Sequence, residues 1–230
     1  MKIGTANIQN LPDMNPHQVA SDGRLMGENC HVWGGQEIAP EDGDCAVIMA
    51  ALPPRWRATH RDTSIPIFWD NQFLELKKRR RIEVAMPEDL ALVRKPRLFT
   101  AALFKVRTRP NLRPFWVVNV HFIANAYNSA GWFEGIERRK AQYDREMAAL
   151  QRFEKQLSNF DRTVFTLGDF NDPQPEMPHP HFKWLAGERL DRVGVTTNGS
   201  VKAEEINDYE LILNSDHNGQ VSNVRLSPRR

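Results

Sequence analysis

The feature that most constrains this chain is the run RTVFTLGDFND, in which a mostly apolar stretch ends in a polar turn. Apolar runs of this length are typical of strands that are buried on both faces. Asp169 and Asn171 follow two residues apart, so an extended backbone would present both side chains on one face. An acid and an amide delivered together at a strand end predict a functional site, although a simple Asx turn would use the same residues.

Further strands are predicted on both sides of this run. Segments rich in β-branched and aromatic residues precede it, namely KIGTANI, CHVWGG, SIPIFWD, FLELKKRRRIEVA, RLFTAALFKVRT and FWVVNVHF, and RLDRVGVTT, YELIL and QVSNVRL follow it. The four segments from SIPIFWD to FWVVNVHF have the spacing of a meandering sheet. The Pro-rich DPQPEMPHPH is expected to be a loop.

Two helical regions complete the expected elements. The stretch from His17 to Glu28 has room for one helix, and apolar residues recur with helical period between Gly131 and Phe160. Strands and helices in this mixture predict an α/β protein. A chain of 230 residues with 40% hydrophobic content can bury a sizeable core, and we expect one domain spanning residues 1–230.

The net charge of this chain does not indicate a binding partner. Thirty-one basic residues against 29 acidic residues leave a formal charge of only +2, far from that of a polybasic binder. The local exception is the unbroken basic run from Lys77 to Arg81. On a surface it could neutralise several phosphates, or it could simply be a solvated strand edge.

Cysteine content and hydropathy bear on the compartment. Cys30 and Cys45 are too few for a disulfide framework and lack the paired spacing of a zinc site. The sequence starts without an apolar leader and contains no stretch of about 18 apolar residues. We therefore expect a cytoplasmic protein without a membrane partner.

Eight acidic, amide and imidazole residues fall at or near the ends of predicted strands. Hydrolysis of a phosphodiester requires a positioned water, a base, neutralisation of charge on the phosphate oxygens and help for the leaving oxygen. A hard cation bound by carboxylate and amide oxygens supplies much of this chemistry. Taken singly, most of these residues have ordinary structural explanations. They are Asn7, Glu37, His121, Asp169, Asn171, Asp191, Asp216 and His217.

Read in order, the motifs resemble those of the endonuclease/exonuclease/phosphatase superfamily, which includes deoxyribonuclease I and the abasic-site endonucleases. TANIQN is similar to the first family motif, GGQEI to the glutamate motif, NVHF to the histidine motif, GDFND to the strand-end motif and NSDH to the terminal acid–histidine pair. SIPIFWD and ERRKAQ also resemble family segments. The resemblance spans residues 3 to 226 and implies a four-layer α/β sandwich, with two packed mixed β-sheets flanked by helices.

The family carries one more aspartate, which supports the terminal histidine, and two positions compete for it. Asp208 in NDYELIL has the family's Asp-Tyr pair, but only eight residues separate it from Asp216, which leaves little room for a strand and a return connection. Asp191 in RLDRVGVTT lies 25 residues before Asp216 and shows better strand alternation. We favour Asp191, which places Arg192 where the family usually has an aromatic residue.

The resemblance implies a role for each residue. Glu37 would bind Mg²⁺, with Mn²⁺ as a possible substitute, while Asn7 and Asp216 orient the ion or its waters. Asp169 would position or deprotonate the attacking water, and Asn171 would donate to the developing charge. His217, held by Asp191, and His121 would contact the phosphate. Asn125 resembles a phosphate-contacting residue of abasic-site endonucleases, and the basic run adds three further substrate contacts: Lys78, Arg79 and Arg80.

Three functions stay open on these motifs. A monomeric nuclease acting on DNA or RNA is the leading expectation, because of the basic run and the tryptophans that could stack on bases. A phosphatase of a small molecule or a phospholipid headgroup would share every motif. A non-catalytic nucleic-acid-binding module on the same scaffold is disfavoured, because each acidic and imidazole position of the family pattern can be filled.

Overall fold

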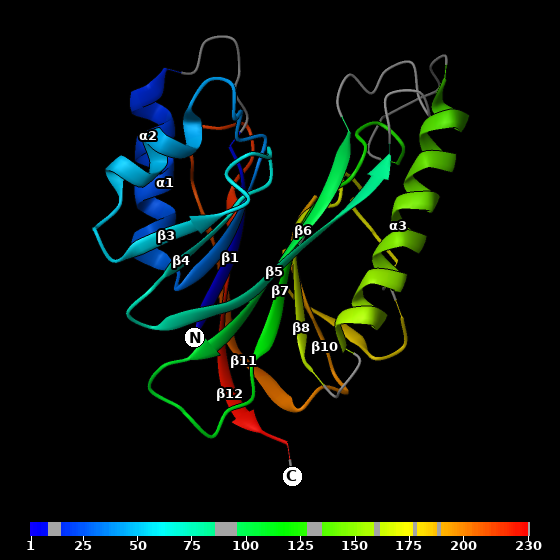
Figure 1. Ribbon diagram of the computed structural model, residues 1–230. Helices are drawn as coiled ribbons and strands as arrows, with labels where there is room; N and C mark the ends of the chain where they lie inside the picture. Colours follow the sequence, from blue (N-terminus) through cyan, green and yellow to red (C-terminus); the bar gives the residue numbers. More distant parts are fainter. Residues whose placement is uncertain are drawn as a thin grey trace.

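The computed structural model describes residues 1–8, 15–85, 96–127, 135–158, 162–176, 179–187 and 190–229. Two six-stranded sheets pack face to face, with helices α1 and α2 on the outside of one sheet and α3 on the outside of the other (Figure 1). The predicted four-layer α/β sandwich is therefore confirmed. None of the helices within these ranges is long and apolar enough to cross a membrane.

The first sheet has the strand order β11-β12-β1-β2-β4-β3. Its strands are β1 (Lys2–Asn7), β2 (Val32–Gln36), β3 (Trp56–Thr59), β4 (Ile67–Asp70), β11 (Val201–Leu211) and β12 (Gly219–Pro228). Strands β1 and β2 run parallel, and the other neighbours are antiparallel. Helices α1 (Pro16–Asn29) and α2 (Asp44–Ala51) cover its outer face.

The second sheet has the strand order β5-β6-β7-β8-β10-β9. Its strands are β5 (Leu74–Ala85), β6 (Arg97–Val106), β7 (Phe115–His121), β8 (Val164–Asp169), β9 (Phe182–Ala186) and β10 (Asp191–Thr196). Here β7 and β8 form the parallel pair. Helix α3 (Ile136–Ser158) packs on the outer face through the apolar side that its period predicts. Residues 131–134 and 159–160 of the predicted helical region lie outside the described residues.

The predicted four-strand meander is wrong by one strand. Strands β5, β6 and β7 form an antiparallel meander, but SIPIFWD supplies β4, which pairs with β2 and β3 of the other sheet. The pairing with β2 lets Phe68 stack on Trp33 at 4.2 Å between ring centroids. Alternation within a strand cannot indicate which sheet the strand joins, so the sequence pattern was compatible with both.

Two strands and one helix went unrecognised in the sequence. Strand β3 has only four residues, and β9 begins directly after the Pro-rich stretch that was expected to be loop. Helix α2 is eight residues long and starts after Gly43, which has a positive φ of 76° and offers no side-chain cap. By contrast, Asn15 begins α1 with a capping box shared with Gln18, the usual start signal of a helix.

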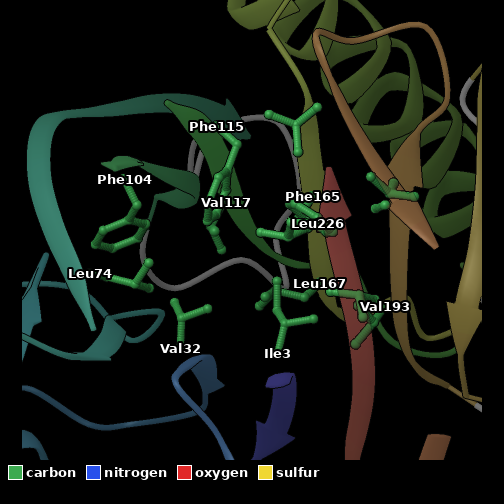
Figure 2. Packing of buried hydrophobic residues seen from close by; sticks show 14 of the residues in the cluster. Ile3, Val32, Leu74, Phe104, Phe115, Val117, Phe165, Leu167, Val193 and Leu226 are labelled. Atoms are coloured by element: carbon green, nitrogen blue, oxygen red, sulfur yellow. The ribbon is translucent and has the colours of Figure 1, made fainter. Parts of the chain in front are cut away.

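The core between the sheets is apolar and receives side chains from both of them. Figure 2 shows Ile3 and Val32 of the first sheet facing Val117, Phe165 and Leu167 of the second. All five side chains are fully buried. Burial of apolar surface on this scale fixes the distance between the sheets, so their strand ends keep a constant relative position.

The two parallel strand pairs end at the same edge of the sandwich. Asn7 is the last residue of β1, next to Gln36 of β2, and His121 is the last residue of β7, opposite Asp169 of β8. Because each neighbouring strand β12 and β10 is antiparallel, its first residues return to this edge. Each sheet thus brings the ends of its parallel pair and the start of the adjacent antiparallel strand to one place.

A buried polar contact ties the sheets together just below this edge. The side-chain amide of Asn119 on β7 accepts a hydrogen bond from Gln36 Nε2 at 2.6 Å. It also donates to the carbonyl oxygens of Gly35 at 2.8 Å and Pro66 at 3.0 Å. Asn119 is fully buried, so its bonds compete with no water. This one side chain therefore fixes the register of β7 against β2.

We expect Asn119→Ala to lower the free energy of unfolding by about 3 kcal/mol, because it removes one hydrogen-bond partner from Gln36 Nε2 and from each of two backbone carbonyls. Urea denaturation would measure the loss. Asn111→Ala, at an exposed position, is the matched control and should change stability by less than about 0.5 kcal/mol. A stability of Asn119→Ala equal to that of the control would contradict the inter-sheet role.

Candidate active site

The eight residues expected to form a site all lie at the edge where the strands of both sheets end. Four come from the first sheet, at the ends of β1 and β2 and in the loop from 212 to 218. Four come from the second, at the ends of β7 and β8, in the turn that follows β8 and at the start of β10. The first group is Asn7, Glu37, Asp216 and His217, and the second is His121, Asp169, Asn171 and Asp191.

Asn7 connects the two groups. Its side-chain Nδ2 donates to Glu37 Oε1 at 3.1 Å and to Asp169 Oδ2 at 2.9 Å. His121 lies beside the same two carboxylates, with its Nε2 3.6 Å from Glu37 Oε1 and 3.8 Å from Asp169 Oδ2. Residues 162 positions apart in the chain are thus in direct contact.

The terminal pair approaches Asp169 from the other side. His217 Nδ1 lies 2.6 Å from Asp191 Oδ2 and 4.0 Å from Asp169 Oδ2. The side chain of Asp216 is 52% exposed and therefore points outward. Its Oδ1 lies 4.0 Å from His217 Nε2. Asp169, which is 1% exposed, lies at the centre of the whole group.

The competing residue Asp208 does not reach His217. It lies on β11 with an exposed side chain, opposite Ser222 of β12. The argument that excluded it was nonetheless wrong, because β11 continues to Leu211 and returns through the short 212–218 loop. Arg192, at the position where the family usually has an aromatic residue, instead lies over the ring of Trp184.

Three backbone positions of the site adopt unusual conformations. Glu37 and Asn171 have positive φ values of 56° and 50°, which residues other than glycine seldom adopt. Gly168 has φ 146°, and a β carbon there would lie 2.0 Å from the carbonyl oxygen of Val120. Glycine is required at that position so that β8 can approach β7 closely enough to place Asp169 beside His121.

The turn after β8 is fixed by the two side chains of the GDFND motif. The amide N–H of Asn171 donates to Asp169 Oδ1 at 2.8 Å, which is an Asx turn. The Nδ2 group of Asn171 donates to the carbonyl oxygen of Phe122 at 2.9 Å, just beyond β7. The structural and functional interpretations of this motif are therefore compatible, since the turn itself orients both side chains.

Burial shapes the protonation of the site. Burial raises the pKa of Asp191 to about 7, and the neighbouring Asp169 adds to the effect. Burial alone would lower the pKa of His217, but the hydrogen bond and charge of Asp191 outweigh it and raise the pKa to about 9. The Asp191–His217 pair therefore holds a proton at neutral pH.

His121 has the opposite character. Burial lowers its pKa, and the guanidinium of Arg97 acts in the same direction. A neutral imidazole does not offset the negative charge of Glu37 and Asp169. The centre of the site is therefore rich in oxygen ligands and short of positive charge.

The side chains present suit a metal ion. Asp169, Asp191 and His217 each offer a ligand atom, these atoms lie within 4.8 Å of one another, and the group could hold a metal ion. The Oδ1 atom of Asn7 is buried without a hydrogen-bond partner beside the carboxylates of Glu37 and Asp169. A buried amide oxygen next to two carboxylates is the donor set that hard cations prefer.

A pocket of about 800 Å³ opens beside Glu37 and His121. Its lining includes Arg81 of the basic run and two arginines that were not predicted as site residues, Arg97 and Arg139. Arg97 donates to the carbonyl oxygen of His121 at 2.6 Å and Arg139 to that of Ala124 at 2.8 Å. Isolated arginines at the start of a strand or on a helix give no sequence signal of their own.

The basic run on β5 is divided by strand alternation. Arg79 and Arg81 are paired with Ala102 and Thr100 of β6, which face the other sheet, so their side chains point to the pocket side. Lys78 and Arg80 are paired with residues whose side chains face α3. The three predicted substrate contacts Lys78, Arg79 and Arg80 thus lie on two different faces.

Asn125 is placed after β7, four residues beyond His121. Its side chain is exposed and its φ is 62°, the left-handed conformation that Asn tolerates better than most residues. Its proposed contact with phosphate stays a prediction.

Comparison of sequences leaves the relationship open, because no protein-family model and no curated protein matches the chain. Comparison of structures is informative. A mannosyl-6-phosphatase from Bacteroides thetaiotaomicron is similar at a TM-score of 0.73, with 13% identity over 98% of this chain and 99% of that one. An endonuclease/exonuclease/phosphatase family protein from the same organism gives 0.71, with 13% identity over 96% and 93%. This chain has the endonuclease/exonuclease/phosphatase fold.

The same fold occurs in TDP2. Truncated TDP2 from Caenorhabditis elegans is similar at a TM-score of 0.66, with 16% identity over 97% of this chain and 96% of that one. The names of these neighbours thus range from a phosphatase to TDP2, and the chain spans nearly the whole of each. Identities of 13–16% carry the fold alone, so activity and substrate must be argued from the site.

Proposed function

We propose that this chain is a Mg²⁺-dependent phosphoesterase. The observation that carries the proposal is the contact of Asn7 with Glu37 and Asp169, in which Nδ2 joins carboxylates from opposite sheets and the buried Oδ1 keeps no hydrogen-bond partner. Keeping such a site costs stability, because buried polar atoms and like charges are held together. A bound divalent cation would offset that cost and give the arrangement a role in phosphoester hydrolysis.

Glu37, Asn7 and Asp216 are the residues that would hold the ion, whereas His217 Nδ1 is engaged by Asp191, so the Asp169–Asp191–His217 group would act on the water and the phosphate instead. The oxygen ligands of Glu37, Asn7 and Asp216 favour Mg²⁺ over softer metals. Mn²⁺ would be an acceptable substitute. When bound, the ion would supply Lewis-acid stabilisation of the charge on the phosphate oxygens. Asp216, being half exposed, can adjust to the ion at the mouth of the site.

Asp169 would act on the attacking water. Its Oδ2 accepts from Asn7 and its Oδ1 accepts from the Asn171 amide, so both oxygens are fixed in orientation. A carboxylate held in this way can position a water and take its proton. Asn171, oriented by the carbonyl oxygen of Phe122, would donate to the charge that develops on phosphate.

Both histidines would contact the phosphate, His217 as a cation and His121 as a neutral imidazole. His217 keeps its proton because of Asp191, so it offers a cationic donor to an oxyanion. His121 is held neutral by burial and Arg97, and it can donate one hydrogen bond without repelling the cation. A site with one charged and one neutral imidazole binds the phosphate and the metal ion together.

Nucleic acid is the substrate that the basic residues favour. Arg79 and Arg81 point to the pocket side, and the pocket adjoins Glu37 and His121. In this proposal a monomer binds the phosphate backbone through these arginines, with no membrane partner. The specific observation that favours a small phosphate ester is the ion pair of Arg81 with Asp62 at 2.6 Å, which neutralises one of these charges.

We expect Asp169→Ala and His217→Ala each to abolish Mg²⁺-dependent hydrolysis of a generic substrate such as bis(p-nitrophenyl) phosphate, with the protein still folded by circular dichroism. Asp208→Ala is the matched control, since this exposed carboxylate on β11 lies outside the site. Excess EDTA should likewise stop the wild-type reaction. Wild-type activity in either site variant, or activity that survives EDTA, would contradict the proposal.

A substrate panel with Mg²⁺ should show cleavage of plasmid, duplex, single-stranded or abasic DNA, or RNA, with affinity that falls steeply as salt rises. Arg79→Ala/Arg81→Ala should weaken binding of the polymer and reduce the salt dependence, whereas Lys78→Ala/Arg80→Ala on the α3 face should change both less. Cleavage confined to a sugar phosphate or a phosphoinositide, with no salt dependence, would favour the small-ester function instead.

A further inference from the structure

The loop from residue 212 to 218, which carries Asp216 and His217, is held from outside the site by Asp22 of α1. Asp22 is 1% exposed. Its two carboxylate oxygens accept the backbone N–H of Asn214 at 2.9 and 3.1 Å. Its Oδ1 also accepts from Asn214 Nδ2 at 2.6 Å. One buried carboxylate thus binds both donors of a single loop residue.

The next residue fastens the loop a second time. Ser215 Oγ donates to the carbonyl oxygen of Asn7 at 2.7 Å and accepts the N–H of His217 at 3.0 Å. Asn214 therefore ties the loop to α1 while Ser215 ties it to the end of β1. His217 follows directly and meets Asp191 at 2.6 Å.

Helix α1 is a rigid support for this contact. A β carbon on Gly23, the residue after Asp22, would lie 2.7 Å from Ile48 Cγ2 of α2, so the two helices pack closely. A β carbon on Gly219, at the start of β12, would lie 2.8 Å from Met26 Sδ of α1. The helix therefore contacts both α2 and the end of the loop, which leaves Asp22 little room to move.

We propose that Asp22 is a positioning residue, which acts through Asn214 to keep the 212–218 loop where His217 meets Asp191. Hydrogen bonds to an ionised carboxylate are stronger than those between neutral groups, and burial removes competition from water. A displacement of about 1 Å at a reacting group can cost about 100-fold in rate. The effect on turnover rests on the proposed function, whereas the effect on the loop does not.

The test compares Asp22→Ala, Asp22→Asn and a control, Asn29→Ala, whose side chain donates to the carbonyl oxygen of Leu25 in the same helix. Hydrogen–deuterium exchange of a peptide covering residues 212–218 reports the loop, and kcat and KM on bis(p-nitrophenyl) phosphate report the site. Asp22→Ala should increase exchange in that peptide and lower kcat about 10- to 100-fold. Its KM should change less, because His217 acts on the phosphate as charge develops.

Asp22→Asn should keep most of the wild-type kcat and of the protection of the loop from exchange. Its amide oxygen can accept the N–H of Asn214, and its amide nitrogen can donate to Asn214 once that side chain turns over. A double variant, Asp22→Ala/Asn214→Ala, should be no slower than Asp22→Ala, because both changes remove the same contact. If Asp22→Ala does not fold, Asn214→Ala, at an exposed loop position, replaces it in the test. Asn214→Ala should also increase exchange of the loop and lower kcat, but by less than Asp22→Ala.

Unchanged exchange of residues 212–218 in a folded Asp22→Ala variant would show that the Asp22–Asn214 contact does not restrain the loop. Increased exchange with wild-type kcat would overturn the positioning role. Should the wild-type protein hydrolyse no phosphate ester, the proposed function fails and the catalytic role of Asp22 falls with it. Exchange would still decide whether Asp22 holds the loop.

Discussion

The side chain of Asn7 is the point on which the rest of the site depends, because it bonds a carboxylate from each sheet. Glu37 follows β2 of the first sheet and Asp169 ends β8 of the second. This contact exists only if the two sheets pack at a fixed distance and register. The apolar core between them and the buried Asn119–Gln36 bond supply that condition.

The same arrangement of strands occurs in both sheets and contributes residues to the site from each of them. Each sheet contains a single parallel pair, β1/β2 and β7/β8, flanked by an antiparallel strand that returns to the same edge. Parallel neighbours end together, so an acid or an amide placed last in each strand must gather at one edge. Loops then add the remaining groups, above all Asp216 and His217, and the acidic groups gathered at this edge suit a cation.

Much of this was accessible from the sequence, because strand ends with polar residues obey local rules. The motif GDFND predicted a polar strand end, but Asn171 follows β8 in a turn with φ 50° and does not continue the extended backbone. The period of α3 predicted its buried face. Which sheet β4 joins was not accessible, since alternation carries no information about partners. Arg97, Arg139 and Asp22 were missed because their importance comes from contacts made only after folding.

The proposed metal ion can be located directly. Anomalous X-ray scattering from crystals soaked in Mn²⁺ would show where the ion binds. We expect one strong peak within coordination distance of Glu37, close to Asn7 and Asp216, which disappears in Glu37→Gln crystals. Mn²⁺ bound elsewhere, or a peak that Glu37→Gln leaves unchanged, would contradict it.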